Sequence, residues 1–431
     1  MKKPLFNMPK SNSANDGRLL KRKSAKTKSS ARQGGGTFVK LSSIVAAVSK
    51  YLKDYIGVYK SVESREELEE YVRSCLECGE VAIDTETTGL NPIINHIVGF
   101  SLYTPSKGYP IYVPLNHISY LSNVKLKHQM SEEDAISCLK KLVKCKEIIM
   151  FNAGFDCRVF KNSLGIQMPC TWDTSLASRC LNENEPEKAL KKLYQKYILK
   201  SEKDAFKYEE LFEGLTFDKV TLDVAYLYAA HDAKITYELY EFQKPFLDYS
   251  ETCEKAGLKD VAWVFHNIEM PCVPAVCEME DTGVLLDMKV VKELNEKYSA
   301  ELAAAKENAY RKLDLYTDEI ASYSGSVKLD NPINLDSPKQ LAVVLYDIMG
   351  LTSKDKKKPR GTGEEILSTL GDDFAEAVLE YRTVNKLINT YIDKLPKCVL
   401  DDGRIHCNFN QYGADTGRFS SRNPNVNWAA A

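Results

Sequence analysis

The stretch VAIDTETTGL at residues 81–90 decides how this chain is interpreted, because a short apolar run ends in two acidic side chains. Val81 to Ile83 predict a buried strand, and Asp84 and Glu86 follow where that strand stops. Residues two apart on an extended chain point to the same side. Two carboxylates at a strand end can therefore hold one divalent cation, although this pattern alone also fits a solvated loop.

The segments around this stretch alternate between strand and helix patterns. Helical spacing appears in residues 64–78, 131–145 and 223–247, and strand patterns appear in residues 81–84, 96–104, 109–115 and 147–151. Strands that alternate with helices predict an α/β domain, in which helices cover both faces of a sheet.

Two further motifs carry chemistry. In FNAGFDCRVF (residues 151–160), Asp156 follows another predicted strand, and Asn152 can bond backbone or ligand. In YAAHDAKITYEL (residues 228–239), Tyr228 and Asp232 are four residues apart on a predicted helix and share one face. A phenol beside a carboxylate suits the orientation of a water molecule near a metal. Alone, each motif also fits a turn, or a core tyrosine beside a surface acid.

The three motifs together make a stronger case than any one of them. They contribute four carboxylates from three elements, and such a cluster is unfavourable unless cations neutralise it. Hard oxygen ligands favour Mg²⁺ or Mn²⁺. Two such ions, about 3.5–4 Å apart, can clamp a phosphodiester and activate a water molecule.

The order D-x-E, N-x-x-x-D, Y-x-x-x-D resembles the DEDD superfamily of 3′–5′ exonucleases, in its tyrosine-bearing branch. The resemblance implies a ribonuclease H-like fold and the release of 5′-mononucleotides from a 3′ end. It implies two bound Mg²⁺ or Mn²⁺ ions held by Asp84, Glu86 and Asp232, with Asp156 holding a metal through water. Tyr228 would position the attacking water.

The same resemblance implies a binding site for the terminal nucleotide. Three residues fall where members of this superfamily contact that nucleotide, namely Thr87, Leu90 and Asn152.

After about residue 265, the sequence pattern changes to one that predicts long helices. Apolar residues recur at spacings of three and four and predict one buried stripe, at Val290, Leu294, Tyr298, Leu302, Ala305, Ala309 and Leu313. In DSPKQL, Ser337 is a predicted helix cap, and Gln340 would complete a capping box. Residues 380–395 predict another helix, and residues 403–414 alternate like a strand.

Four blocks in this half resemble the family A DNA polymerases, of the DNA polymerase I type. They are residues 268–287, 333–351, 380–396 and 406–425, and the last contains the specific pattern TGRFSS. The resemblance implies a mainly helical thumb that grips a primer–template duplex of DNA. It also implies contacts of Arg382 and Lys386 with the template backbone, and of Arg418 with the primer end. Alternatively, Arg382 and Lys386 are surface cations that pair with acids such as Glu380.

These resemblances predict five parts of the chain. The expected parts are a basic flexible leader (1–37), a linker (38–61), the exonuclease domain (62–247), the thumb (265–396) and a short β start of a palm (397–431). The two aspartates that carry the polymerase metals in this family do not appear before the chain ends. We therefore expect a truncated palm, and DNA synthesis only if a separate chain supplies palm and fingers.

Charge is unevenly distributed in this chain of net charge −2. The first 40 residues contain eleven lysines or arginines against one acid, Asp16. Such a basic arm either contacts nucleic acid or stays a solvated tail, and both interpretations stay open.

Twelve cysteines are scattered along the chain, with no secretory segment and no apolar run of the ~18 residues that span a membrane. We expect a soluble protein with free thiols in the cytoplasm of a bacterial or phage-infected cell. Cys75 and Cys78 form a lone C-x-x-C pattern, and a zinc site needs a second pair.

Two rival functions remain. A ribonuclease D-like 3′–5′ exoribonuclease shares the acidic motifs but should carry a different helical domain after them. A catalytically silent DNA-binding accessory fragment should lack at least one metal ligand, and all four carboxylates are present.

Overall fold

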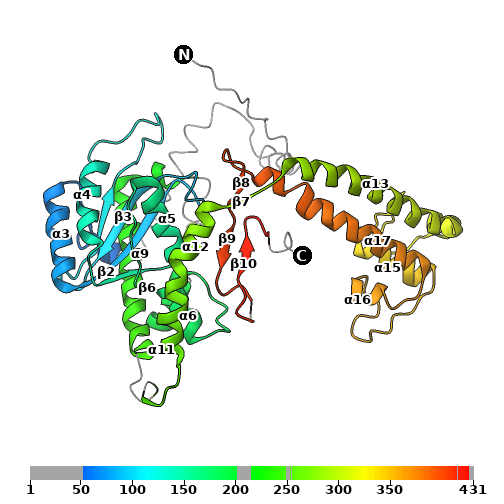
Figure 1. Cartoon of the computed structure of the whole chain (residues 1–431). Helices are drawn as coiled ribbons and strands as arrows, with labels where there is room; N and C mark the ends of the chain where they lie inside the picture. The colour runs from blue at the N-terminus through cyan, green and yellow to red at the C-terminus, as the bar shows by residue number, and fades with distance from the viewer. Residues whose placement is uncertain (1–51, 201–214, 249–252, 254, 415, 427–431) are drawn as a thin grey trace. The chain divides into compact units, whose positions relative to one another are not determined.

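The computed structural model describes residues 52–200, 215–248, 253, 255–414 and 416–426 (Figure 1). The chain forms two compact units, Met1–Cys277 and Glu278–Ala431. The predicted leader (1–37) lies outside the described residues, as does most of the predicted linker.

A six-stranded sheet organises the first unit. Its order is β1-β4-β3-β2-β5-β6. The strands are β1 (Lys60–Ser61), β2 (Glu80–Thr87), β3 (Ile97–Tyr103), β4 (Ile111–Pro114), β5 (Glu147–Met150) and β6 (Trp172–Asp173). Strand β2 pairs antiparallel with β3 and parallel with β5. The predicted strands are present, and β2 lies inside the sheet.

Helices flank this sheet as the sequence predicted. The longer ones are α3 (Arg65–Cys78), α4 (Glu132–Leu142), α5 (Ala153–Leu164), α6 (Thr174–Leu181), α9 (Leu222–Leu247) and α12 (Met270–Thr282). Short ones are η2 (Lys53–Tyr55), α7 (Leu190–Tyr194), η3 (Gln195–Leu199), η4 (Phe217–Lys219), α11 (Val261–Val264) and η5 (Phe265–Glu269). Ser131 caps α4 by accepting a hydrogen bond from the Asp134 amide, as expected.

Contacts with α9 and α5 show that helices cover both faces of the sheet. On one face, the Tyr237 hydroxyl of α9 donates to Glu80 at 2.6 Å. On the other face, Phe100 packs edge-on against Phe160 of α5, with ring centroids 6.0 Å apart. Glu80 is an even number of residues from Asp84 and Glu86, so all three side chains lie on the face of the sheet that α9 covers.

The first unit extends beyond the predicted exonuclease boundaries at both ends. Leu52 and Tyr59 are buried in its core, although they precede residue 62. Met270 and Val273 of α12 also pack into the core, and the unit ends at Cys277. Because these apolar side chains pack into the core, the first unit is longer than the exonuclease domain that the sequence pattern predicted.

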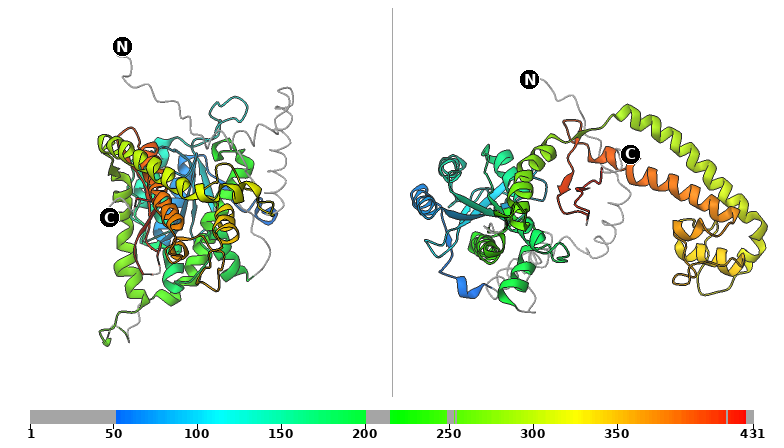
Figure 2. Two further views of the ribbon diagram at one scale, coloured as in Figure 1. Left: turned by 90° about the vertical axis from the view of Figure 1, so that its right-hand side faces the viewer. Right: turned by 60° about the horizontal axis from the view of Figure 1, so that its bottom comes forward.

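Two long helices run side by side in the second unit, α13 (Met288–Leu313) and α17 (Asp373–Leu387) (Figures 1 and 2). Shorter helices are η6 (Asp314–Tyr316), α14 (Thr317–Ser322), α15 (Pro338–Ala342), η7 (Val343–Ile348), α16 (Glu364–Leu367), η8 (Ile388–Ile392) and η9 (Leu395–Cys398). Two small antiparallel sheets pair β7 (Val284–Leu285) with β8 (Arg404–Ile405), and β9 (Asn408–Asn410) with β10 (Ser420–Arg422).

Two details of the second unit differ from the sequence prediction. The apolar stripe of α13 is buried only in its second half, where Ala309 packs with the core of α15 and α17, whereas Val290 is 45% exposed. The capping box is wrong in part. Ser337 caps α15, but the Gln340 side chain bonds back to Asp330 and the Asn334 amide.

The described helices include none that is long and apolar enough to cross a membrane. All twelve cysteines lie in the described residues, and none of them forms a disulfide there.

Gly99 of β3 is a position in the sheet where a side chain does not fit. A Cβ there would lie 2.6 Å from the Val113 carbonyl oxygen and would also clash with the Tyr112 hydroxyl. Tyr112 is fully buried, and its hydroxyl lies 2.7 Å from His117 Nε2. The ring therefore crosses the sheet directly over Gly99, and neither neighbour can move away easily.

We expect Gly99→Ala to lower the free energy of unfolding by about 1–3 kcal/mol, the usual cost of overpacking. Denaturation followed by tryptophan fluorescence measures this, because Trp172 and Trp263 both belong to the first unit. Gly154→Ala is the matched control, since only Cys277 Sγ approaches that Cβ, at 4.0 Å. Equal stability of the two variants would contradict the packing argument.

Candidate metal centre

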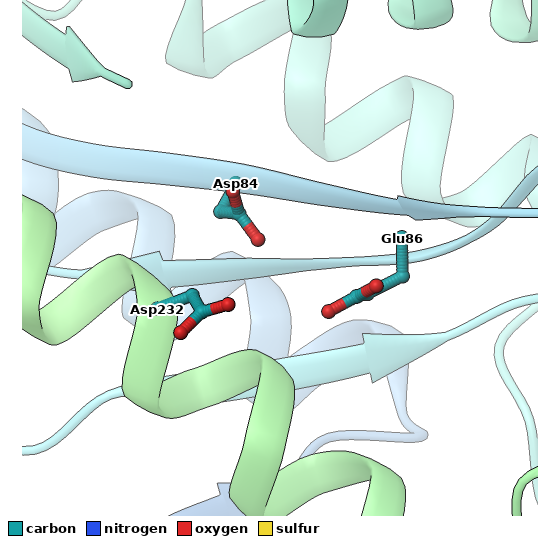
Figure 3. A group of neighbouring side chains, drawn as sticks. All are labelled: Asp84, Glu86 and Asp232. Carbon is teal, nitrogen blue, oxygen red and sulfur yellow. The ribbon is translucent and has the colours of Figure 1, made fainter. Parts of the chain in front are cut away.

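Three carboxylates converge between β2 and α9. Asp84 and Glu86 come from β2 and Asp232 comes from α9, and the three point toward one another (Figure 3). Each offers one oxygen, and these oxygens lie within 4.8 Å of one another. The sequence predicted this group from strand parity and from the D-x-E and Y-x-x-x-D motifs.

Asp156, the fourth predicted carboxylate, is held differently. Its Oδ1 accepts hydrogen bonds from the Thr85 amide at 3.0 Å and from the Thr85 hydroxyl at 2.5 Å. Thr85 lies between the two acids of β2 and faces the other side of the sheet. Asp156 thus ties α5 to β2 beside the cluster without belonging to the group of three, and its role as a metal ligand stays a prediction.

The start of α5 depends on an acid that the sequence analysis missed. Asp173 is 3% exposed and caps α6, where its Oδ1 accepts from the Ser175 and Leu176 amides. It also accepts from the amides of Asn152, at 3.1 Å, and Ala153, at 2.8 Å. These bonds fix the turn in which Asn152 adopts φ 61° and in which the side chain of Asn152 is exposed. An aspartate before a helical pattern was the available signal.

Tyr228 lies one helical turn before Asp232 on α9 and is 5% exposed. Its ring lies 5.9 Å from that of Phe217, measured between centroids. The sequence therefore correctly placed a phenol and a carboxylate on one helix face. Tyr228 is also a core residue and Asp232 is buried, so Asp232 is not the surface acid of the alternative interpretation. The role of Tyr228 in positioning a water molecule stays a prediction.

Lys191 of α7 joins this pair, and no motif indicated it. Its Nζ donates to the Tyr228 hydroxyl oxygen at 2.8 Å and to Asp232 Oδ2 at 2.8 Å. The same Nζ lies 3.9 Å from the centroid of the Tyr228 ring. In sequence, Lys191 is one of two adjacent lysines on a short helix, and nothing there separates it from a solvated helix face.

Two of the residues predicted to contact the terminal nucleotide are Thr87 and Leu90. Thr87 is the last residue of β2, and Leu90 lies in the segment that follows it. The Thr87 hydroxyl donates to the Gly89 carbonyl at 2.6 Å. Leu90 follows and is 90% exposed, which is unusual for a leucine. Contacts of Thr87 and Leu90 with a nucleotide stay predictions.

Burial dominates the electrostatics of the cluster. Burial raises the pKa of Asp84 well above its ordinary value, and the charges of Asp156, Asp232 and Glu86 raise it further. Burial and Asp232 likewise raise the pKa of Glu86, while Lys191 opposes the shift. The pKa of Asp156 rises to about 7 through burial, although its hydrogen bonds from Thr85 lower it.

The residues present fit a divalent cation. Carboxylate oxygens are the ligands that Mg²⁺ and Mn²⁺ prefer. Asp232 Oδ1 is buried without a hydrogen-bond partner among the described residues, whereas Oδ2 is bonded to Lys191. A buried carboxylate oxygen without a partner is costly, and a cation bound by the cluster would satisfy it.

The basic side chains of the second unit that were predicted to contact DNA differ in burial. Arg382 is half-buried and donates to the carbonyl oxygens of Leu335, at 3.1 Å, and Thr362, at 2.6 Å. It therefore fastens α17 to two loops, a role that helical periodicity did not reveal. Lys386 and Arg418 are exposed. Contacts of all three with DNA stay predictions.

The raised pKa values predict how stability responds to pH and to metal. A folded chain whose carboxyl pKa is raised binds more protons than the unfolded chain, so its stability falls as pH rises above about 4 and through the folded-state pKa. With EDTA, we expect a lower unfolding midpoint at about pH 8 than at about pH 5.5. Mn²⁺ should raise the midpoint, and most at the higher pH, because it binds the ionised folded state.

Thermal unfolding at both pH values, with EDTA or Mn²⁺, measures this effect. Asp84→Asn is the informative variant, because it removes one of the repelling charges and one ligand. It should show a smaller pH dependence and a smaller response to Mn²⁺. Equal responses of this variant and the parent chain would contradict a cation site at the cluster.

Two family models match this chain. Residues 59–247 match a model described as 3′-5′ exonuclease, and residues 291–428 match one described as DNA polymerase family A. The three clustered carboxylates lie in the first match.

Several similar proteins carry the name DNA polymerase I. The chain is 30% identical to that of Pseudomonas aeruginosa over 370 residues, which cover 83% of this chain and 37% of the relative. It is 31% identical to that of Synechocystis sp. over 362 residues, 80% of this chain and 33% of the relative. It is 27% identical to the DNA polymerase of Escherichia phage T5 over 390 residues, 85% of this chain and 42% of the relative.

The fold also resembles that of a solved structure, the POL domain of Pol1 from M. smegmatis in complex with DNA primer-template and dNTP. The TM-score is 0.62 at 20% identity, and the match covers 85% of this chain and 55% of that one. The chain spans between a third and about two fifths of the length of the three relatives above. Over 80% or more of its length, the chain thus resembles DNA polymerase I proteins, with a 3′–5′ exonuclease region followed by a region of DNA polymerase family A.

Proposed function

We propose that this chain is a 3′–5′ exonuclease that removes nucleotides from the 3′ ends of DNA, as in proofreading during DNA replication and repair. The observation that carries the proposal is the convergence of Asp84, Glu86 and Asp232 inside the region that matches the exonuclease model. These three residues would hold divalent metal, with two Mg²⁺ or Mn²⁺ ions as the finer proposal. Asp156 would complete the set through water.

The reaction divides between the metal and the protein side chains. Bound divalent cations would polarise the scissile phosphate and lower the pKa of the attacking water. Oxygen from water bonds to phosphorus, and the bond from phosphorus to the 3′ oxygen of the preceding nucleotide breaks. The product is a 5′-mononucleotide.

The side chains around the cluster hold the substrate and the water. The Tyr228 hydroxyl, one turn from Asp232, positions the attacking water. The exposed Leu90 contacts the terminal base, and Thr87 and Asn152 contact the same nucleotide. Because Asp156 fixes β2 through Thr85, it also keeps Asp84 and Glu86 at the spacing that the metal requires.

The second unit would act as a thumb that binds duplex DNA, with residues 397–431 as the start of a palm. Its basic segment, Lys354–Arg360, contains four exposed lysines at 354, 356, 357 and 358. Arg360 is engaged with Asp347 at 2.5 and 2.7 Å, so the lysines are the better candidates for phosphate contacts. The family A region favours this reading over a ribonuclease D-like one.

The exonuclease proposal is tested with a single-stranded DNA labelled at its 5′ end, incubated with Mg²⁺. Asp84→Ala should lower the rate by about 10²-fold or more, because it removes a metal ligand that stabilises the transition state. Asp223→Ala is the matched control, since Asp223 is exposed on the same helix as Asp232. No shortening by the parent chain would sink the proposal, and faster shortening of the same strand in RNA would favour the exoribonuclease.

The thumb proposal predicts salt-dependent binding of duplex DNA. Each lost phosphate contact should lower the slope of log K against log salt by about 0.9, so Lys357→Ala with Lys358→Ala should lower it by nearly 2. Fluorescence anisotropy over a salt series measures this slope. Lys289→Ala with Lys292→Ala removes equal charge from the exposed start of α13 and serves as control. Equal slopes for both pairs would contradict a specific role of the basic segment.

A further inference from the structure

Lys191 is the one ammonium group that the described residues place directly on both Tyr228 and Asp232. Its side chain is 18% exposed, and that of Asp232 is 12% exposed. A lysine this close to carboxylates that are proposed to hold metal is unexpected as a bystander, because its charge repels the cation that they would bind. Its presence calls for a function that outweighs this repulsion.

The position of Lys191 is fixed by the contacts of α7. Leu193 is 1% exposed, and the Tyr194 hydroxyl donates to Glu238 of α9 at 2.6 Å. The loop before α7 is anchored by the buried Glu185 carboxylate, which accepts from Lys196 Nζ at 2.7 Å. The first bond thus joins α7 to α9, and the second closes the loop before α7 onto the helix that follows it. The Lys191 ammonium is therefore presented to the site by a constrained element.

The two hydrogen bonds of Lys191 define the orientation of both acceptors. One carboxylate oxygen of Asp232, Oδ2, accepts from Lys191, and the other, Oδ1, is the buried oxygen without a partner. The bond to Oδ2 thus fixes the rotation of the carboxylate and with it the position of Oδ1. Because Lys191 donates to the Tyr228 oxygen, the phenol accepts there, and its own hydrogen points away from Lys191.

We propose that Lys191 is a positioning residue of the exonuclease site, whose ammonium group orients the Tyr228 hydroxyl and the Asp232 carboxylate and offsets part of the negative charge of the cluster. This inference rests on the proposed function. It assigns Lys191 an effect on turnover at the expense of cation affinity. If Lys191 only stabilised the fold, its replacement would not lower turnover while raising cation affinity.

The variant Lys191→Met keeps the length of the side chain and removes its charge. With a 5′-labelled single-stranded DNA at saturating Mg²⁺, we expect kcat to fall by about 10²-fold, the effect of a misplaced reacting group, with KM for DNA within about threefold. Titration with Mn²⁺ followed by electron paramagnetic resonance should show cation binding at least about threefold tighter, because a repelling charge is gone. Lys191→Arg should return the cation affinity to that of the parent chain and restore part of kcat.

Two controls separate positioning from folding. Lys188→Met removes an exposed lysine three residues earlier and should change neither kcat nor Mn²⁺ affinity. In the Tyr228→Phe background, Lys191→Met should lower kcat less than in the parent chain, because part of its effect acts through the missing hydroxyl.

Several results would overturn the inference. One is a kcat of Lys191→Met close to that of the parent chain. Another is a joint loss of kcat, Mn²⁺ affinity and thermal stability, which would make Lys191 a structural residue only. If the parent chain cleaves no DNA, the exonuclease proposal fails by itself. The Mn²⁺ titration then decides alone, since tighter binding by Lys191→Met supports the charge role, and equal or weaker binding excludes it.

Discussion

The gathering of negative charge at one end of β2 is the constraint on which the first unit depends. Three carboxylate oxygens within 4.8 Å of one another repel, and burial removes the water that would otherwise screen them. Such a cluster persists only if other parts of the fold hold it. Here, Lys191 binds one member from α7, and the hydrogen bonds from Thr85 to Asp156 lock the strand between the other two. The surrounding elements therefore act as a frame for an arrangement that would not form by itself.

Strand β2 contributes side chains to both faces of the sheet, and this explains why so few residues build the site. Its even-numbered residues, Glu80, Asp84 and Glu86, face α9, whereas Thr85 binds the first turn of α5. Gly99 lies opposite Glu86 in the register and lets the Tyr112 ring cross the sheet there. A displacement of β2 by one residue would exchange the two faces and separate every partner, so the register of the sheet and the geometry of the cluster depend on the same contacts.

The parts of the site that follow local periodicity were predictable from the sequence, and the parts that depend on distant contacts were not. The parity of Asp84 and Glu86, and the helical turn between Tyr228 and Asp232, follow from backbone geometry alone. The bond from Lys191 to Asp232 spans 41 residues, and the one from Thr85 to Asp156 spans 71. No spacing rule reports such pairs. Arg382 shows the same limit, because periodicity located it on a helix but could not reveal the carbonyl groups that it binds.

The division into two units constrains how the proposed activities depend on each other. All carboxylates of the cluster, together with Tyr228 and Lys191, lie between residues 84 and 232, inside the first unit. The proposed cleavage site is thus assembled from contacts within the first unit, and its proposed ligands all come from that unit. The exposed lysines of residues 354–358 belong to the other unit and have no part in the cluster. A change in the second unit should therefore alter which DNA is bound and how tightly, whereas a change at Asp84 or Asp232 should alter the bond-breaking step itself.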